Sequence, residues 1–230
     1  MSAIKHTILS VMKGAKRSLK KRTVKKKFLH ENVPYFSQWE SPELVEKIIT
    51  NEFSAEDDPN WKKSGADSKV EYAAWSASGC GMACTKMLVA HLWDREVPLA
   101  VLGKKCAEYG GYTLPVEDSI GLIYAPYARF AKEELGLTAK AVIPLFVAEI
   151  VEELSAGKYV IASVSHKIRQ PLDTAAKKGG HLVLTLGYDL NKKELYFHNP
   201  SGFSKDTQEY ASISFSDFKK FFGGRGIISR

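Results

Sequence analysis

The feature that most restricts the folds open to this chain is a change of hydrophobic period near residue 138. Before that point, apolar residues recur at helical spacing in several stretches. Ser41 followed by Pro42 suits the start of a helix. The sequence predicts helices over 41–53, 80–93, 98–109 and 117–135, the last broken near Pro126, with a polar connection over 54–72.

After residue 138 the pattern is that of a sheet. Runs rich in Val, Ile, Tyr and Phe alternate with turn residues, and the basic loop 166–180 separates the two longest runs. Two helical stretches, 145–154 and 216–222, interrupt the series. The predicted strands are 139–143, 159–165, 181–188, 195–199 and 226–230. Helices followed by antiparallel strands indicate the α+β class.

The net charge of +7 is concentrated at the start of the chain. Residues 1–30 hold ten Lys and Arg and no acidic residue, whereas the rest holds 23 basic and 26 acidic residues. A body that is not basic disfavours nucleic acid as a partner. The basic arm, residues 1–29, also has an apolar stripe at helical spacing. It is predicted either to be solvated and partly disordered or to lie on an anionic membrane surface.

Length and cysteine content indicate the domain organisation and the cellular location. At 230 residues, the chain is expected to hold the arm and one domain over 30–230. Three cysteines without a C-x-x-C pair argue against a disulfide framework and predict a reducing location, the cytoplasm. The protein would be peripheral to a membrane only if the arm lies on one, the second of the two alternatives for the arm. No run of 18 apolar residues occurs, so no membrane span is predicted.

A cysteine between two glycines is the strongest candidate nucleophile. Cys80 follows the loop-like run 73–78 and stands at the predicted first turn of helix 80–93. Unpaired N–H groups and the dipole at a helix N-terminus favour a thiolate there. Gly79 would let a substrate approach closely. The ordinary alternative is a buried packing cysteine, which we expect for Cys84 and Cys106.

Three further residues supply what a nucleophile needs. His181 opens a predicted strand directly after two glycines, so one face of its imidazole can border a cleft. Asn199 ends the next strand, where antiparallel pairing could bring it to His181 to fix the tautomer. Gln38 could donate an N–H to a developing oxyanion. Taken singly, these residues equally suit a packed His, an Asn-Pro turn and a Gln that satisfies local backbone groups.

The chain order Gln38, Cys80, His181, Asn199 resembles that of the papain-like superfamily, and more closely that of the C39-like cysteine peptidases. The resemblance covers about residues 32 to 200. It is carried by Val33-Pro34-Tyr35-Phe36-Ser37-Gln38, by Gly79-Cys80-Gly81-Met82-Ala83-Cys84, by Gly179-Gly180-His181-Leu182-Val183-Leu184 with Gly187-Tyr188-Asp189, and by His198-Asn199-Pro200. It implies a papain-like fold in which an N-terminal helical half packs on a C-terminal antiparallel sheet.

The resemblance also implies an activity, the cleavage of a peptide or amide bond in a peptide or protein substrate through an acyl-enzyme, without metal or cofactor. Cys80 would attack, His181 would act as base, Asn199 would orient it, and Gln38 with the Cys80 N–H would hold the oxyanion. The expected substrate-binding residues are Trp39, Trp75, Gly79 and Gly180.

Three departures from the family pattern stand out. Gln38 and Cys80 are 42 positions apart, which predicts an insertion over about 42–72 that covers part of the cleft. Met82 stands where relatives often have proline. Asn199 stands where they often have Asp, so Asp189 is a second, weaker candidate to orient His181.

Other readings remain open at this stage. The same fold could transfer an acyl group to an amine or hydrolyse a small amide, or it could be an inactive binding module. A metal site of Cys80, Cys84 and His181 is a further alternative, although only two of these ligands have regular spacing.

Overall fold

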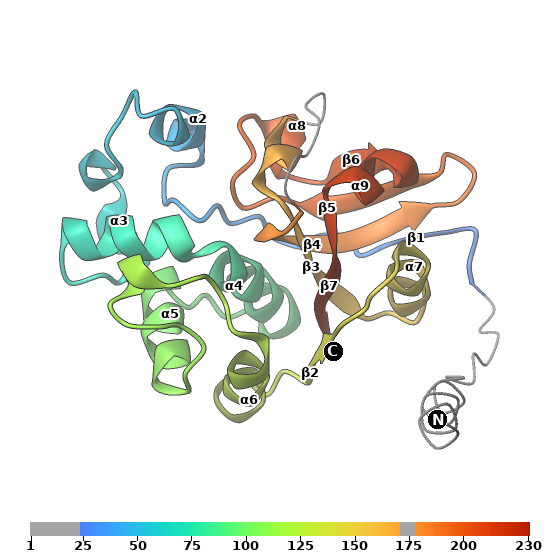
Figure 1. Cartoon of the computed structure of the whole chain (residues 1–230), viewed down its shortest axis with the longest axis horizontal. Helices are drawn as coiled ribbons and strands as arrows, with labels where there is room; N and C mark the ends of the chain where they lie inside the picture. Colours follow the sequence, from blue (N-terminus) through green and yellow to red (C-terminus); the bar gives the residue numbers. More distant parts are fainter. Residues whose placement is uncertain (1–23, 171–177) are drawn as a thin grey trace, which may run out of the picture.

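The structure, a computed structural model, describes residues 24–170 and 178–230 (Figure 1). Most of the basic arm, with its apolar stripe, lies outside the described residues, so its membrane contact stays a prediction. The helices are α2 Val45–Ile49, α3 Lys69–Ser78, α4 Cys80–Trp93, α5 Leu99–Glu108, α6 Tyr124–Leu135, α7 Val147–Ser155, α8 Lys205–Gln208 and α9 Phe215–Phe221. The strands are β1 Lys27–Leu29, β2 Ala139–Val142, β3 Tyr159–Ser165, β4 Gly180–Asp189, β5 Glu194–His198, β6 Ala211–Ser214 and β7 Phe222–Ser229.

Within the described residues, these seven strands form one antiparallel sheet. Its order is β2-β7-β3-β4-β5-β6. The short β1 pairs with the last residues of β4, beyond the point where β3 stops pairing. The predicted α+β class is confirmed, with the helices α3 to α6 on one side of the sheet and α7 on the other (Figure 1).

Alternation along the strands creates two apolar layers. In β3, Tyr159 and Ile161 belong to the core shared with α3 to α6, whereas Val160 and Ala162 belong to the core shared with α7 and α9. A strand whose side chains point alternately to two faces can serve both layers. The central strands are therefore buried on both sides, which fixes the position of residues at their ends.

The sequence interpretation was wrong about the residues before Cys80. Residues 73–78 are not a loop but the second half of α3, which ends at Gly79, directly before α4. Ser68 caps this helix, since its hydroxyl accepts the Glu71 N–H at 3.1 Å. Burial of Trp75 and Ser76 holds the helix in place, and this tertiary contact is not visible in local periodicity.

The predicted helix 41–53 is shorter than expected. A 3₁₀ turn, Pro42–Leu44, leads into the five residues of α2. The Ser41 hydroxyl does not cap it but donates to the buried carboxylate of Asp58 at 2.6 Å. Asp58 also accepts from the Ser41 N–H and the Tyr72 hydroxyl, so its oxygens connect the start of this 3₁₀ turn to α3.

Two further boundaries differ from the prediction. Pro126 does not break a long helix; it lies in the first turn of α6, where a missing N–H costs nothing. The C-terminal strand begins at Phe222 instead of 226, directly after α9. Strands β1 and β6, of three and four residues, were not predicted. In the described part of the chain, no helix has the length and apolarity needed to cross a membrane.

Candidate active site

Cys80 is the first residue of α4, with Gly79 as the N-cap. A Cβ on Gly79 would lie 2.7 Å from the Trp75 carbonyl oxygen and 2.9 Å from Leu99 Cδ2. Glycine is therefore required here by the tight junction between α3 and α4 and by the approach of α5. The absence of a side chain serves packing at this position, and the junction sets where the thiol points.

The start of α4 lies against the start of β4. The Cys84 thiol, one turn into the helix, contacts the Leu182 carbonyl oxygen at 3.8 Å. A Cβ on Gly81 would lie 3.1 Å from Leu182 Cδ1, so the helix and strand approach each other closely at this point. Because His181 directly precedes Leu182 on the strand, this packing brings the imidazole to the thiol end of the helix.

Cys80 and His181 line the same pocket, of about 350 Å³. Two residues far apart in the sequence thus share one cavity at the boundary of the helical and sheet halves. Gly180 also lines it, with φ +97° and open space where a side chain would be. The other lining residues are Ile120, Gly121, Leu122, Ile123, Tyr124, Ile143, Ser163, Leu182 and Arg225.

His181 is held by Asn199 at the end of β5. His181 Nε2 lies 2.8 Å from Asn199 Oδ1. The same oxygen accepts the backbone N–H of Ser201 at 3.2 Å, which fixes the orientation of the amide. Because Oδ1 accepts, Nε2 carries the hydrogen, and Nδ1 is left as the acceptor. This is the tautomer that a base needs if it takes a proton through Nδ1.

Asp189, the other candidate partner of His181, lies at the opposite end of β4. Its Oδ1 accepts the N–H groups of Asn191 and Lys192 at 2.8 and 3.1 Å, within the hairpin turn. It is Asn199 that bonds to His181.

Gln38 is buried and tied to two parts of the site. Its backbone N–H donates to the Pro200 carbonyl at 2.9 Å, next to Asn199. Its side-chain Nε2 donates to the Ser76 carbonyl at 2.8 Å, at the end of α3. Oε1 is buried and has no hydrogen-bond partner among the described residues. Nε2 also lies 3.5 Å from the Ala77 carbonyl oxygen, a long contact, so its second hydrogen is only weakly held and could turn to an oxyanion.

The two tryptophans expected to bind substrate are buried in the core. Trp39 packs with Val45 and Tyr72. Trp75 is 2% exposed and meets Tyr112 edge to face, with ring centroids 5.4 Å apart. Neither lines the pocket at Cys80. Nor does any residue of 42–72, the segment predicted to cover part of the cleft.

Burial and one nearby cation set the ionisation of the pair. Burial raises the pKa of the Cys80 thiol, while backbone hydrogen bonds from Leu182 and Gly81 and the charge of Arg169 oppose that shift. Burial, aided by Arg169, lowers the pKa of His181 to about 3. Both groups are therefore neutral at rest near pH 7, and a proton must move when the thiol attacks.

The chain matches the family model described as "Peptidase_C39 like family" over residues 30–226. The chain belongs to this family. A solved C39-like peptidase from Bacillus anthracis has 16% sequence identity to it and a TM-score of 0.54, covering 89% of this chain and 97% of that one. The peptidase domain of Streptococcus ComA, a bi-functional ABC transporter, has 14% identity and a TM-score of 0.47, covering 66% of this chain and 90% of that domain. No curated protein matches the chain.

Two polar residues of this C39-like site were missed by the sequence analysis. Ser201 is fully buried, and its hydroxyl lies 3.0 Å from His181 Nε2. Arg169 donates its Nε–H to that hydroxyl at 2.8 Å. The position of Ser201, two residues after Asn199, was the one signal for it in the sequence. Arg169 gave no signal, because it is one of several basic residues in the loop after β3.

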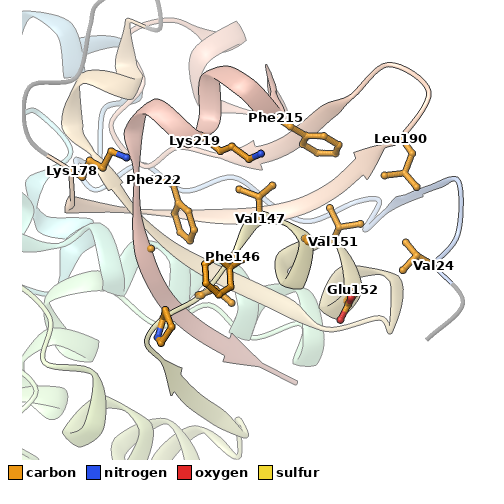
Figure 2. A pocket seen from close by; sticks show the side chains of 14 residues that line it. Val24, Phe146, Val147, Val151, Glu152, Lys178, Leu190, Phe215, Lys219 and Phe222 are labelled. Atoms are coloured by element: carbon orange, nitrogen blue, oxygen red, sulfur yellow. The ribbon is translucent and has the colours of Figure 1, made fainter. Parts of the chain in front are cut away.

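A larger groove of the C39-like domain lies elsewhere, with a volume of about 790 Å³. Figure 2 shows Phe146, Val147 and Val151 of the α7 region facing Phe215 and Phe222 across it. Among the described residues, neither a cysteine nor a histidine lines this groove. Size alone would therefore select the wrong cavity for nucleophilic chemistry.

The metal alternative finds no support in the described part of the C39-like domain. Within residues 24–170 and 178–230, no group of three or more His, Cys, Asp or Glu is placed to hold a metal ion. The candidate set of Cys80, Cys84 and His181 belongs to this region. Cys84 is buried, with its sulfur near a backbone carbonyl.

Proposed function

We propose that this C39-like domain is a cysteine peptidase-like hydrolase that cleaves a peptide or amide bond through an acyl-enzyme. One observation carries the proposal: Cys80 and His181 line one pocket, and Asn199 Oδ1 accepts from Nε2 of the imidazole. Family membership supports the same class of reaction. The substrate implied is a peptide or protein, and the chemistry requires no metal or cofactor.

The first step transfers one proton and forms one bond. His181 Nδ1 accepts the proton of the Cys80 thiol while the sulfur attacks the substrate carbonyl carbon, and the carbonyl oxygen becomes an oxyanion. The Cys80 N–H, at the start of α4, is one donor to that oxyanion. The second Nε2–H of Gln38, which makes only the 3.5 Å contact to the Ala77 carbonyl, is the second donor that we assign.

The remaining steps restore the enzyme. His181, now protonated at Nδ1, gives that proton to the leaving amine as the carbon–nitrogen bond breaks, and a thioester to Cys80 remains. Water then attacks the thioester with His181 again as base, which releases the acid and the free thiol. Asn199 accepts the Nε2–H throughout, so the imidazole keeps one orientation during both transfers.

Labelling by a neutral thiol-directed electrophile, followed by peptide mass spectrometry, tests the proposal. Cys80 should react well before Cys84 and Cys106, which are both fully buried. Cys80→Ala should abolish rapid labelling, whereas Cys84→Ala and Cys106→Ala should not. Equal labelling of all three cysteines would contradict an activated nucleophile.

Turnover distinguishes the hydrolase from its alternatives. A peptide mixture incubated with the full chain should yield new termini that Cys80→Ala does not produce. Products that appear only when an amine is added would identify an acyltransferase instead. Selective labelling without turnover of peptides or amides would favour a binding module.

A further inference from the structure

Arg169 is an unusual neighbour for a cysteine–histidine pair. It ends the 3₁₀ turn His166–Arg169, directly after β3, and its side chain is half-buried. Its Nε–H donates to the buried Ser201 hydroxyl at 2.8 Å, which connects the β3 end to the loop after β5. A guanidinium has only donors, so the Ser201 oxygen must accept from it.

That donation holds the Ser201 oxygen in place beside the imidazole. Ser201 Oγ lies 3.0 Å from His181 Nε2 and 3.5 Å from Asn199 Oδ1. With one lone pair given to Arg169, the oxygen can still accept from Nε2–H, and its own hydrogen is directed to Asn199 Oδ1. Without the Arg169 donor, the Ser201 side chain can turn away, so Nε2–H loses this second acceptor and the tautomer with the hydrogen on Nδ1 gains population. That tautomer has no acceptor at Nδ1, the nitrogen that must take the thiol proton.

The charge of Arg169 acts on the same pair. Its cation opposes the rise in the pKa of Cys80 and contributes to the low pKa of His181. The pocket lining contains no acidic side chain within the described residues that form it. Arg169 thus favours the thiolate and disfavours the imidazolium. Of the other titratable groups near the pair, His166 also lowers the pKa of His181, whereas Cys80 itself raises the pKa values of Cys84 and Tyr112.

We infer that Arg169 is a positioning residue for the proposed reaction, holding the base-competent tautomer of His181 through Ser201 while its charge stabilises the Cys80 thiolate. The inference rests on the proposed function, because it assigns a role within that reaction. Its cation offsets part of the cost that burial imposes on the Cys80 thiolate, in a site where Asn199 carries no charge.

Three variants separate the two effects. Arg169→Met removes both the charge and the donor, Arg169→Lys keeps a charge, and Ser201→Ala removes the bridge but keeps the charge. The rate at which iodoacetamide labels Cys80 across pH 5–10 measures thiolate formation without requiring turnover. Nitrogen-15 NMR of labelled histidine reads which nitrogen of His181 carries the hydrogen. Arg129→Met, on the exposed face of α6, is the matched arginine control.

Arg169→Met should raise the apparent pKa of labelling and slow the reaction at pH 7 by about tenfold, the size expected for loss of one nearby opposite charge. Arg169→Lys should stay within about threefold of the parent, and Arg129→Met should be unchanged. Ser201→Ala should keep the labelling profile, because the charge remains.

Arg169→Met should also populate the tautomer with the hydrogen on Nδ1. Should Arg169→Met not fold, Arg169→Gln, which keeps a donor without charge, should show the pKa change alone.

The outcomes distinguish the two proposals. If Cys80 reacts no faster than Cys84 and Cys106 in the parent chain, the proposed function fails. If Cys80 reacts selectively but the charge-removing variants have the parent labelling profile and the parent tautomer, only the role of Arg169 is overturned. A loss of thermal stability with both readouts unchanged would assign Arg169 a purely structural role.

Discussion

Asn199 Oδ1 accepts from both His181 Nε2, at 2.8 Å, and the Ser201 N–H, at 3.2 Å, while Asn199 Nδ2 is buried without a partner among the described residues. The oxygen of this amide therefore does the orienting, and the nitrogen contributes no hydrogen bond. Removing the oxygen in Asn199→Ala should lower kcat/KM by about 10²–10⁴-fold, as expected when a base loses its orienting group. Steady-state kinetics on any peptide substrate would measure this, and parent-like activity would exclude Asn199 from the site.

Asn199→Asp tests the effect of a charge at this position while keeping the hydrogen bond to His181. It keeps the accepting oxygen and replaces the unpaired nitrogen with a second oxygen, so the geometry can persist. A carboxylate next to the imidazole favours the imidazolium and should raise the pKa of His181 from its present value of about 3. The acid limb of the pH profile of kcat/KM should then move to higher pH, with activity retained within about tenfold. A profile that overlays the parent would mean that position 199 does not contact His181 during turnover.

Gln38 can be tested for the oxyanion role separately from its structural role. Gln38→Met keeps the length of the side chain but has no N–H, so it also leaves the Ser76 carbonyl without its 2.8 Å donor. Because that carbonyl keeps the Gly79 N–H at 3.3 Å, we expect a stability loss of about 0.5–1.5 kcal/mol, the net value of one hydrogen bond. We expect a separate fall in kcat of about 10²–10³-fold if the second N–H serves the oxyanion. Urea unfolding and kinetics on the same sample would read both, and a stability loss with unchanged kcat would leave Gln38 only a structural role.

The elements predicted from sequence are those whose pattern is local. The predicted strand 159–165 coincides with β3, because its β-branched residues alternate between two apolar layers. The predicted helix 80–93 coincides with α4, whose apolar residues face both α5 and β4. By contrast, α3 is stabilised by burial of Trp75 against Gly103 of α5, a contact about 30 positions away. Local periodicity contains no trace of such a contact.

In the site, too, features with a local sequence pattern could be predicted and features that depend on distant contacts could not. The pairing of β4 with β5 made it possible to expect Asn199 near His181 from sequence, because antiparallel neighbours meet at their ends. The Ser201–Arg169 connection could not be expected, since it depends on how the turn after β3 meets the loop after β5. Aromatic residues were predicted to line the cleft, yet Trp39 and Trp75 are core residues. The large apolar surface of Trp makes core packing as natural as binding.

The pH dependence of stability should report the buried imidazole. Because the pKa of His181 is about 3 in the fold and about 6.5 when exposed, only the unfolded chain binds its proton near pH 5. Stability from this group is complete above pH 6.5 and is lost as the pH falls toward 3, with a slope of about 1.4 kcal/mol per pH unit. His181→Gln should remove about that slope from urea unfolding measured at pH 4.5–6. Cys80→Ser, which alters the same pocket but keeps His181, should retain it, and equal slopes in both variants would contradict the assignment.

Arg225 should set a preference for charge in the substrate. It lines the pocket from β7, its side chain is exposed, and Gly179 allows the guanidinium to lie close, since a Cβ there would be 3.0 Å from Arg225 Nη2. With no acidic residue among the described residues of that lining, an electrophilic peptide with Glu next to its reactive group should label Cys80 about 3–10-fold faster than the same peptide with Lys. The difference should shrink in 0.5 M salt, because screening acts within about 4 Å. Arg225→Glu should reverse the preference while a Gln probe reacts at an unchanged rate. If the three probes react equally with the parent chain, charge at Arg225 does not contribute to selection.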